Sequence, residues 1–452
     1  MKAIRFSLTS LMLLALAGWL AVAPSVSAAE LARQFELEEF SVFEAEGPLQ
    51  YMLRSGQYAR DCGDEPDERV KTYPALKSAN PVYGSVPFAM DLLDFNSGQA
   101  YCFVLDESGG AGTGYDRLYF DANHDFDLTN DRVLKPAEDL PEGFEAGRGG
   151  PQETMFESAD VRLIGAANET LPPVTVWPRV LTAGSRRIVF FLVPTARRGK
   201  ITLGSKEMDV ILAQTSVVTG RYDHPSTGLF LDNQQTGLGV LSDWPEVDGT
   251  LYRILPTPAG DKVTVRAYDG AFGTLEVQSS SGAPAEVERG WFHGEGIIID
   301  IAKCSKEGSK LRVPVGDYRP YYLAVRVGKL RAGVRARIPE PREKVPPAPL
   351  GLHVREGQPC VFKLDQKPDV VFQTPELSER LEPGQEVQIK ALMVDSATNL
   401  MLAGLEDTTR KVGEPLKLPD GSEYQRYESL DPVIKIANAA GETVAEGKMP
   451  FG

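Results

Sequence analysis

Histidine and cysteine are scarce in this sequence, with four of each among 452 residues. No histidine pair has the H-E-x-x-H spacing of a metalloprotease, no two cysteines form C-x-x-C, and the nucleophile elbow G-x-S-x-G is missing. A zinc site, a thiol redox site and a serine-elbow hydrolase therefore have little support. The cysteines allow three full pairings; among them we favour Cys62 with Cys102, because the loop that this bond closes is modest.

Long apolar runs are also few. The run Leu11–Val22 follows Lys2 and Arg5 and precedes small residues that end at Ala28, which is the pattern of a secretory signal peptide over residues 1–28. No later stretch is apolar for long enough to cross a membrane. We therefore expect cleavage near Ala28 and a secreted or periplasmic protein without a membrane span.

Positive charge is in deficit. The chain has 48 Lys and Arg against 63 Asp and Glu, a net charge of −15. Removing residues 1–28 leaves 452 − 28 = 424 residues and removes two basic residues, which gives −15 − 2 = −17. That length suits two or three domains. An acidic surface argues against nucleic acid and anionic membrane as partners and suits calcium binding or solubility, so the partner we expect is a protein or a polysaccharide of unknown identity.

Helical periodicity is rare, whereas short Val, Ile, Tyr and Phe runs between Gly and Pro are common, so we expect a mostly β, multidomain protein. After a Pro-rich charged stretch, short alternating strands joined by Pro-Gly, Asp-Gly and Ala-Gly turns suggest an immunoglobulin-like sandwich. The expected divisions are a signal peptide 1–28, an N-terminal segment with an acidic loop 29–81, a β domain 82–255, a β-rich middle region 256–337, a Pro-rich linker 338–350 and an immunoglobulin-like β-sandwich 351–452.

One acidic loop carries a chemical signal in its spacing. Oxygen-bearing side chains alternate at Asp121, Asn123, Asp125 and Asp127, and Asp131 follows as a possible closing carboxylate. A tight loop can turn all of them toward one centre, and this is the ligand set that calcium prefers. Without a cation, each close pair of carboxylates repels by about 1 kcal/mol even at the dielectric of water.

This loop resembles the D-x-N-x-D-x-D calcium loop of EF-hands and dockerins. The resemblance implies Asp121, Asn123 and Asp125 as the first three ligands, with Ca²⁺ as the cofactor. The sequence departs from the family at the sixth position, Phe126 in place of Gly, and at the twelfth, Arg132 in place of an acid. The alternative is an Asn/Asp-rich turn whose side chains bond their own backbone.

Other resemblances are shorter. The pair of segments 311–318 and 321–327 is similar to a strand pair of prealbumin-like sandwich modules, and the whole arrangement resembles uncharacterised secreted bacterial β-proteins. These likenesses imply a fold and no activity.

Two segments of the β domain are alike. Residues 104–121 and 211–232 each predict a strand, a Thr-Gly-(x)-Tyr-Asp turn and a second strand that ends in Asp. The second copy lacks the alternating acids. Duplication and chance similarity of two hairpins are both open.

We expect a secreted calcium-binding β protein that serves as a binding or structural component of the cell envelope or extracellular space. The alternative is an extracellular hydrolase, with carbohydrate as the candidate substrate, for which His293 and Glu295 beside Trp291 are the nearest candidates for an acid/base pair. No catalytic residue can be assigned from sequence, so an enzyme is the less favoured of the two.

Overall fold

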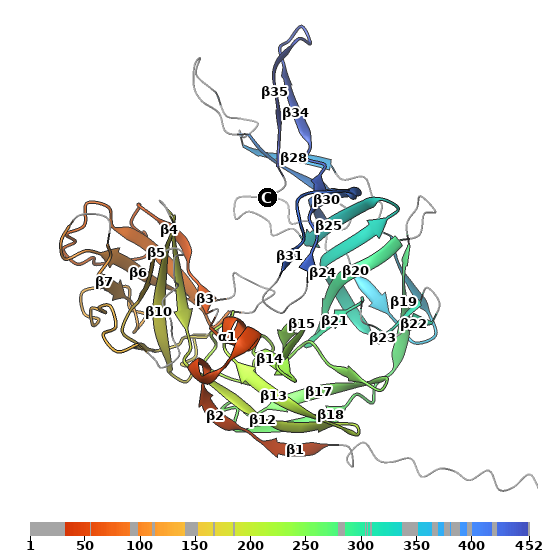
Figure 1. Cartoon of the computed structure of the whole chain (residues 1–452), viewed down its shortest axis with the longest axis horizontal. Coiled ribbons are helices and arrows are strands. Elements are labelled where there is room, and N and C mark those ends of the chain that lie inside the picture. The colour runs from red at the N-terminus through yellow and green to blue at the C-terminus, as the bar shows by residue number, and fades with distance from the viewer. Residues whose placement is uncertain are drawn as a thin grey trace, which may run out of the picture.

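Figure 1 shows the computed structural model of the chain, in which nearly all regular elements are strands. The mostly β class is thereby confirmed. In the part of the chain described, the helices are α1 (Gly47–Leu53) and a 3-10 turn, Val42–Glu44, and no helix is long and apolar enough to cross a membrane. The structure describes residues 32–54, 56–90, 98–110, 114–140, 152–165, 168–183, 186–278, 285–302, 304, 306–307, 310–336, 351–363, 369–374, 380, 389–395, 400–417 and 423–450. The predicted signal peptide and linker lie outside these residues.

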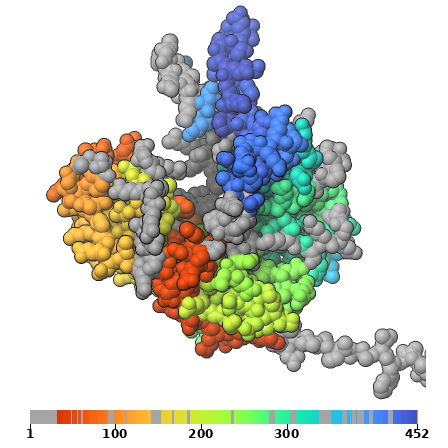
Figure 2. Space-filling view, in the orientation of Figure 1, coloured from red at the N-terminus to blue at the C-terminus, as the bar shows by residue number. Residues whose placement is uncertain are grey.

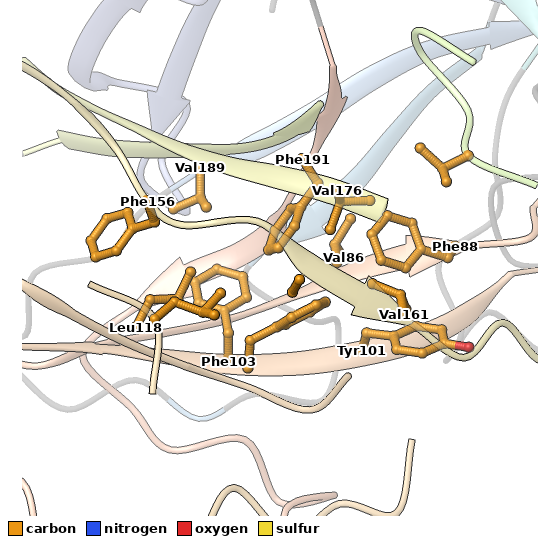
Figure 3. Close-up of a cluster of buried hydrophobic side chains, with 14 of the residues drawn as sticks. Val86, Phe88, Tyr101, Phe103, Leu118, Phe156, Val161, Val176, Val189 and Phe191 are labelled. Carbon is orange, nitrogen blue, oxygen red and sulfur yellow. The ribbon is translucent and has the colours of Figure 1, made fainter. Parts of the chain in front are cut away.

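The first β-sandwich carries the acidic loop. Its two sheets face each other across a core that includes Phe88, Phe103 and Phe191, whose side chains point toward one another in Figure 3. One sheet has the order β4 (Arg60–Gly63), β5 (Val82–Phe88), β6 (Gln99–Asp106), β7 (Arg117–Phe120). The other has the order β3 (Gln57–Tyr58), β11 (Arg186–Leu192), β10 (Val174–Ala183), β8 (Gln152–Met155), with β9 (Ala159–Val161) also on β10.

The outer face of the β4–β7 sheet is also covered. Tyr83, Val104 and Tyr119 point to this face and pack with Leu128 of the acidic loop and with residues of the preceding segment 70–76. Because both faces are covered, β5 and β6 are buried almost along their whole length instead of alternating.

The second sandwich has its own core, which includes Leu212, Leu229 and Val265. One sheet has the order β15 (Gln234–Val240), β14 (Gly228–Leu231), β13 (Lys206–Ala213), β12 (Thr195–Leu203), β2 (Glu38–Ser41). The other has the order β1 (Arg33–Glu36), β18 (Lys262–Ala267), β17 (Thr250–Pro256), β16 (Glu246–Val247). Helix α1 packs on the far face of the first sheet, against Ile211 and Phe230.

The third sandwich has a core that includes Phe292, Leu323 and Phe362. Its smaller sheet has the order β22 (Lys306–Glu307), β23 (Lys310–Pro314), β19 (Phe272–Gln278), β27 (Pro359–Lys363). Its nine-stranded sheet has the order β21 (Ile297–Asp300), β20 (Ala285–Gly294), β24 (Gly316–Val327), β25 (Leu330–Ala336), β30 (Leu400–Lys411), β29 (Lys390–Asp395), β28 (Asp369–Thr374), with β26 (Leu352–Val354) on β24 and β33 (Tyr427–Ser429) on β30.

Two small strand pairs complete the fold. They are β31 (Leu416–Lys417) with β32 (Glu423–Tyr424), and β34 (Val433–Ala437) with β35 (Thr443–Lys448). The β34–β35 hairpin projects from the body of the molecule (Figures 1 and 2), and every residue of β35 is exposed.

Residues 351–452 do not form the independent sandwich expected from the sequence. β26 pairs with β24, β27 pairs in parallel with β19, and β30 pairs with β25, so three strands of this range complete sheets that begin before residue 338. The sequence signals identified the strands correctly, but they do not encode which sheet edge each strand joins. The predicted boundary at residues 338–350 is therefore wrong.

The range 82–255 is likewise not one unit. It spans the first two sandwiches, each with its own core, and the second takes β1 and β2 from the N-terminal segment and β18 from the predicted middle region. Two related hairpins inside one range suggested one domain, but each hairpin packs against a different sheet.

The expected bond between Cys62 and Cys102 is also wrong. Cys62 packs against the first core, with its sulfur 3.2 Å from the place where Gly84 would carry a Cβ. Cys102 lies opposite Ser85, the next position along β5, and neighbouring positions of a strand point to opposite faces. The two thiols therefore lie on opposite faces of one sheet.

Candidate metal centre

The loop begins at the end of β7 with a buried aspartate. The Asp121 backbone N–H donates to the Cys102 carbonyl (3.0 Å), which ties the start of the loop to β6. Its carboxylate, fully buried, accepts the N–H of Asp125 on one oxygen (3.0 Å) and the N–H of Phe126 on the other (3.1 Å). The chain thus curls around Asp121, whose pKa is raised because burial outweighs these bonds.

The next oxygens form a chain of short turns. Asn123 Oδ1 accepts the N–H of Asp125, Asp125 Oδ1 that of Asp127, and Asp127 Oδ1 that of Thr129, each at 2.9 Å. Such bonds to the amide two residues ahead are Asx turns. All four alternating side chains therefore bond to the loop's own backbone.

The missing glycine does not prevent the sharp bend. Phe126 has φ 65° and His124 has φ 60°, so both adopt the left-handed conformation that usually favours Gly. Such a conformation costs on the order of 1–2 kcal/mol per residue. Stacking offsets part of this cost, because the His124 ring lies between Phe126 (4.8 Å between centroids) and Tyr101 (4.6 Å).

Asp131 closes the loop from inside. Its Oδ2 is buried and has no hydrogen-bond partner. Burial raises the pKa of Asp131 to about 7, and the nearby charges of Asp121, Asp125 and Asp127 contribute, against a hydrogen bond from the Ala122 backbone. A hollow of ≈ 400 Å³ adjoins Asp131 and is also lined by Arg132 and Asp160.

Arg132, at the position where the EF-hand family has an acid, lines the same hollow as Asp131. Its guanidinium donates to the carbonyl of Ser158, which also lines that hollow.

A segment that precedes β5 holds the loop from outside. The Lys71 N–H donates to the Phe126 carbonyl (2.8 Å), and the Leu128 N–H donates to the Thr72 carbonyl (3.0 Å). Leu128 itself is fully buried on the outer face of the sheet. Sequence reasoning missed both supports; an apolar residue inside an acidic loop was the one local signal for the second.

The loop is not a preformed cage. Among the described residues, no group of three Asp, Glu, His or Cys side chains converges as metal ligands do. Asp121, Asp125, Asp127 and Asp131 are near enough to influence one another electrically, but Asp121, Asp125 and Asp127 each use at least one oxygen to accept a backbone amide of the loop. These are also the bonds of the Asx-turn alternative, so calcium binding stays a prediction.

The second copy has the same hairpin and a different end. Val104 and Ile211 face outward at matching places, and the Asp232 N–H donates to the Asp209 carbonyl (2.9 Å) as Asp121 does to Cys102. The hairpin then closes at once through Asp232 and Asn233, which have φ 50° and 60°. No oxygen-rich loop follows there.

The residues proposed for an acid/base pair lie at the β20–β21 turn. His293 is half-buried opposite Ile298 and Arg319, and Glu295 is exposed in the turn.

Comparison of the chain with protein-family models, curated proteins and solved structures finds no match.

Proposed function

We propose that the chain is a calcium-binding β protein, with the loop Asp121–Asp131 as the cation site, that works outside the cytoplasm as a binding or structural component. The observation that carries the proposal is the buried, unpartnered Oδ2 of Asp131 beside three other carboxylates. Ionisation of this carboxyl is unfavourable, because burial and the neighbouring carboxylates both disfavour its charge. A divalent cation is the simplest group that removes this cost and the mutual repulsion together.

The donor set fits calcium better than other metals. Carboxylate, amide and backbone oxygens suit hard cations, and the near-absence of Cys and His from the loop disfavours zinc and copper. Calcium would be held by Asp121, Asn123, Asp125, Asp127 and Asp131. Because their oxygens bond backbone amides, binding requires a modest rearrangement, and we expect weak affinity, on the order of the 10⁻⁴ to 10⁻³ M of extracellular modules.

The hydrolase alternative has one supporting feature, a hollow of ≈ 290 Å³ lined by Glu169, Asp223 and His224 among others. Arg221 binds Asp223 through two bonds (2.8 and 2.7 Å) and lowers its pKa, so Asp223 stays ionised. Glu169 is exposed. Glycoside hydrolysis needs a buried carboxylic acid that keeps its proton, whereas Asp223 stays ionised and Glu169 is not buried. We therefore favour the binding protein.

Calcium titration tests the proposal. A ligand that binds only the folded state, at a hundredfold excess over its dissociation constant, adds about 2.7 kcal/mol to the free energy of unfolding. Millimolar calcium should raise the melting temperature and chelator should reverse the rise. Asp125→Ala should remove most of the response, while Asp232→Ala, the matched change in the second hairpin, should keep it. Absence of heat and of stabilisation on titration, or equal responses of the two variants, would refute the proposal.

A further inference from the structure

The ammonium group of Lys71 lies against the loop. Lys71 Nζ donates to the Asp125 carbonyl (2.9 Å), and the same ammonium lies 5.7 Å from the centroid of the Phe126 ring. Lys71 is exposed, so nothing in its surroundings requires it for packing.

The position of Lys71 is fixed by the backbone and does not depend on its charge. Its N–H bonds the Phe126 carbonyl, the Leu128 N–H bonds the Thr72 carbonyl, and Thr72 forms a parallel bridge with Asp127. These bonds hold residues 71–72 beside the loop through an isolated β-bridge. A side-chain substitution at Lys71 therefore leaves the support of the loop in place.

We propose that the ammonium of Lys71 lowers the affinity of the loop for calcium by electrostatic repulsion. The proposal rests on the proposed function, since it concerns the same site. The ammonium and a divalent ion in the loop repel each other. At a separation on the order of 8 Å and the dielectric of water, this repulsion weakens binding by about fivefold.

This repulsion has a functional consequence. A loop with four carboxylates would otherwise bind calcium more tightly, and the fixed ammonium shifts its response to higher concentrations. Electrostatic opposition of this kind is also screened by salt, because the Debye length is about 10 Å at 0.1 M ionic strength. The effect of Lys71 should thus shrink as salt is added.

The second hairpin provides a matched lysine. Lys206 Nζ lies 3.2 Å from Asp232 Oδ2, so this ammonium forms an ion pair directly with the aspartate that corresponds to Asp121. No acidic loop follows Asp232. A charge change at Lys206 therefore controls for a general change in net charge.

The experiment compares calcium dissociation constants of the full chain by isothermal titration at low and high salt. Lys71→Gln keeps a side-chain donor for the Asp125 carbonyl and removes the charge, and it should bind calcium about fivefold more tightly at low salt, with a smaller gain at 1 M salt. Lys71→Arg, which keeps the charge, and Lys206→Gln should bind like the parent.

The outcomes separate this inference from the proposed function. If the parent binds calcium and Lys71→Gln binds equally or more weakly, the inference is overturned while the calcium site stands. A gain that persists unchanged at high salt also overturns it, because the cause is then not electrostatic. If the parent does not bind calcium at all, the proposed function fails and this inference fails with it.

Discussion

The β6–β7 and β13–β14 hairpins follow one plan and end in different ways. Leu105 faces Leu118 in the first and Leu212 faces Leu229 in the second, and both pairs point into the core of their own sandwich. Each hairpin then reaches an aspartate whose N–H bonds the partner strand. The first continues into the acidic loop, and the second makes a two-residue turn.

In both hairpins a side-chain oxygen at the end of the first strand accepts backbone N–H groups of the connection between the strands. We call this contact the staple. Glu107 accepts the N–H of Gly114, and Gln214, at the matching position, accepts the N–H of Gly220 (2.7 Å) and of Thr219 (2.8 Å). This shared staple, which the sequence comparison did not use, strengthens the case for duplication over chance. It also shows that the hairpin itself does not require the acidic loop, since the second copy forms it without such a loop.

The largest difference between the two hairpins should appear when Leu128 is truncated. Only the first hairpin has such a buried apolar residue in the loop that follows it. Leu128 is fully buried against Tyr83, Val104 and Tyr119, so Leu128→Ala should lower the free energy of unfolding by about 2–5 kcal/mol in urea denaturation. Leu140→Ala, at a leucine that is 42% exposed, should change it by less than about 0.5 kcal/mol. Equal small effects would show that the Asx turns alone hold the loop.

The staples test how far the two hairpins are equivalent. Gln214→Ala leaves two amide groups without their acceptor at a site where Gln214 was buried, and should cost about 1–3 kcal/mol in the free energy of unfolding. Glu107→Ala should cost a similar amount, whereas Glu107→Gln, which keeps the acceptor oxygen, should cost little. If only one hairpin is sensitive, the common plan does not extend to the turns.

Sequence reasoning succeeded where the determining information is local. Alternation and turn residues located strands such as β18, and the spacing of oxygens located the acidic loop, because both patterns repeat over a few residues. The resemblance of the two hairpins was also visible, since it lies in neighbouring side chains.

The rest depends on contacts between distant segments. β19 pairs in parallel with β27, more than eighty positions further along the chain, and nothing in either strand specifies that choice. In the same way, Lys71 reaches the loop from fifty-four positions before Asp125. The sequence position of Asp131 suggested it as the closing carboxylate. That its Oδ2 is buried without a hydrogen-bond partner depends on how the loop folds back on the sheet, and the sequence did not predict it.

The smallest and most specific difference between the hairpins is the titration of Asp131. The pKa of this carboxyl is raised to about 7, above an unfolded value of about 3.9, because burial and neighbouring carboxylates favour the protonated form. Its contribution to stability is therefore complete below pH 4 and is lost as pH rises through 7. In chelator, Asp131→Asn, which does not titrate, should match the parent near pH 4 and exceed it at pH 8 by less than about 4 kcal/mol, because solvent screens this half-buried carboxyl. In excess calcium the order should reverse at pH 8, since the ionised carboxylate is the form that binds the cation.

Thermal unfolding across this pH range measures both effects, with Asp232→Asn as the control in the second hairpin. A pH dependence that is the same for Asp131→Asn and the parent would show that Asp131 carries no unusual charge, and the loop would then differ from the second hairpin in length alone.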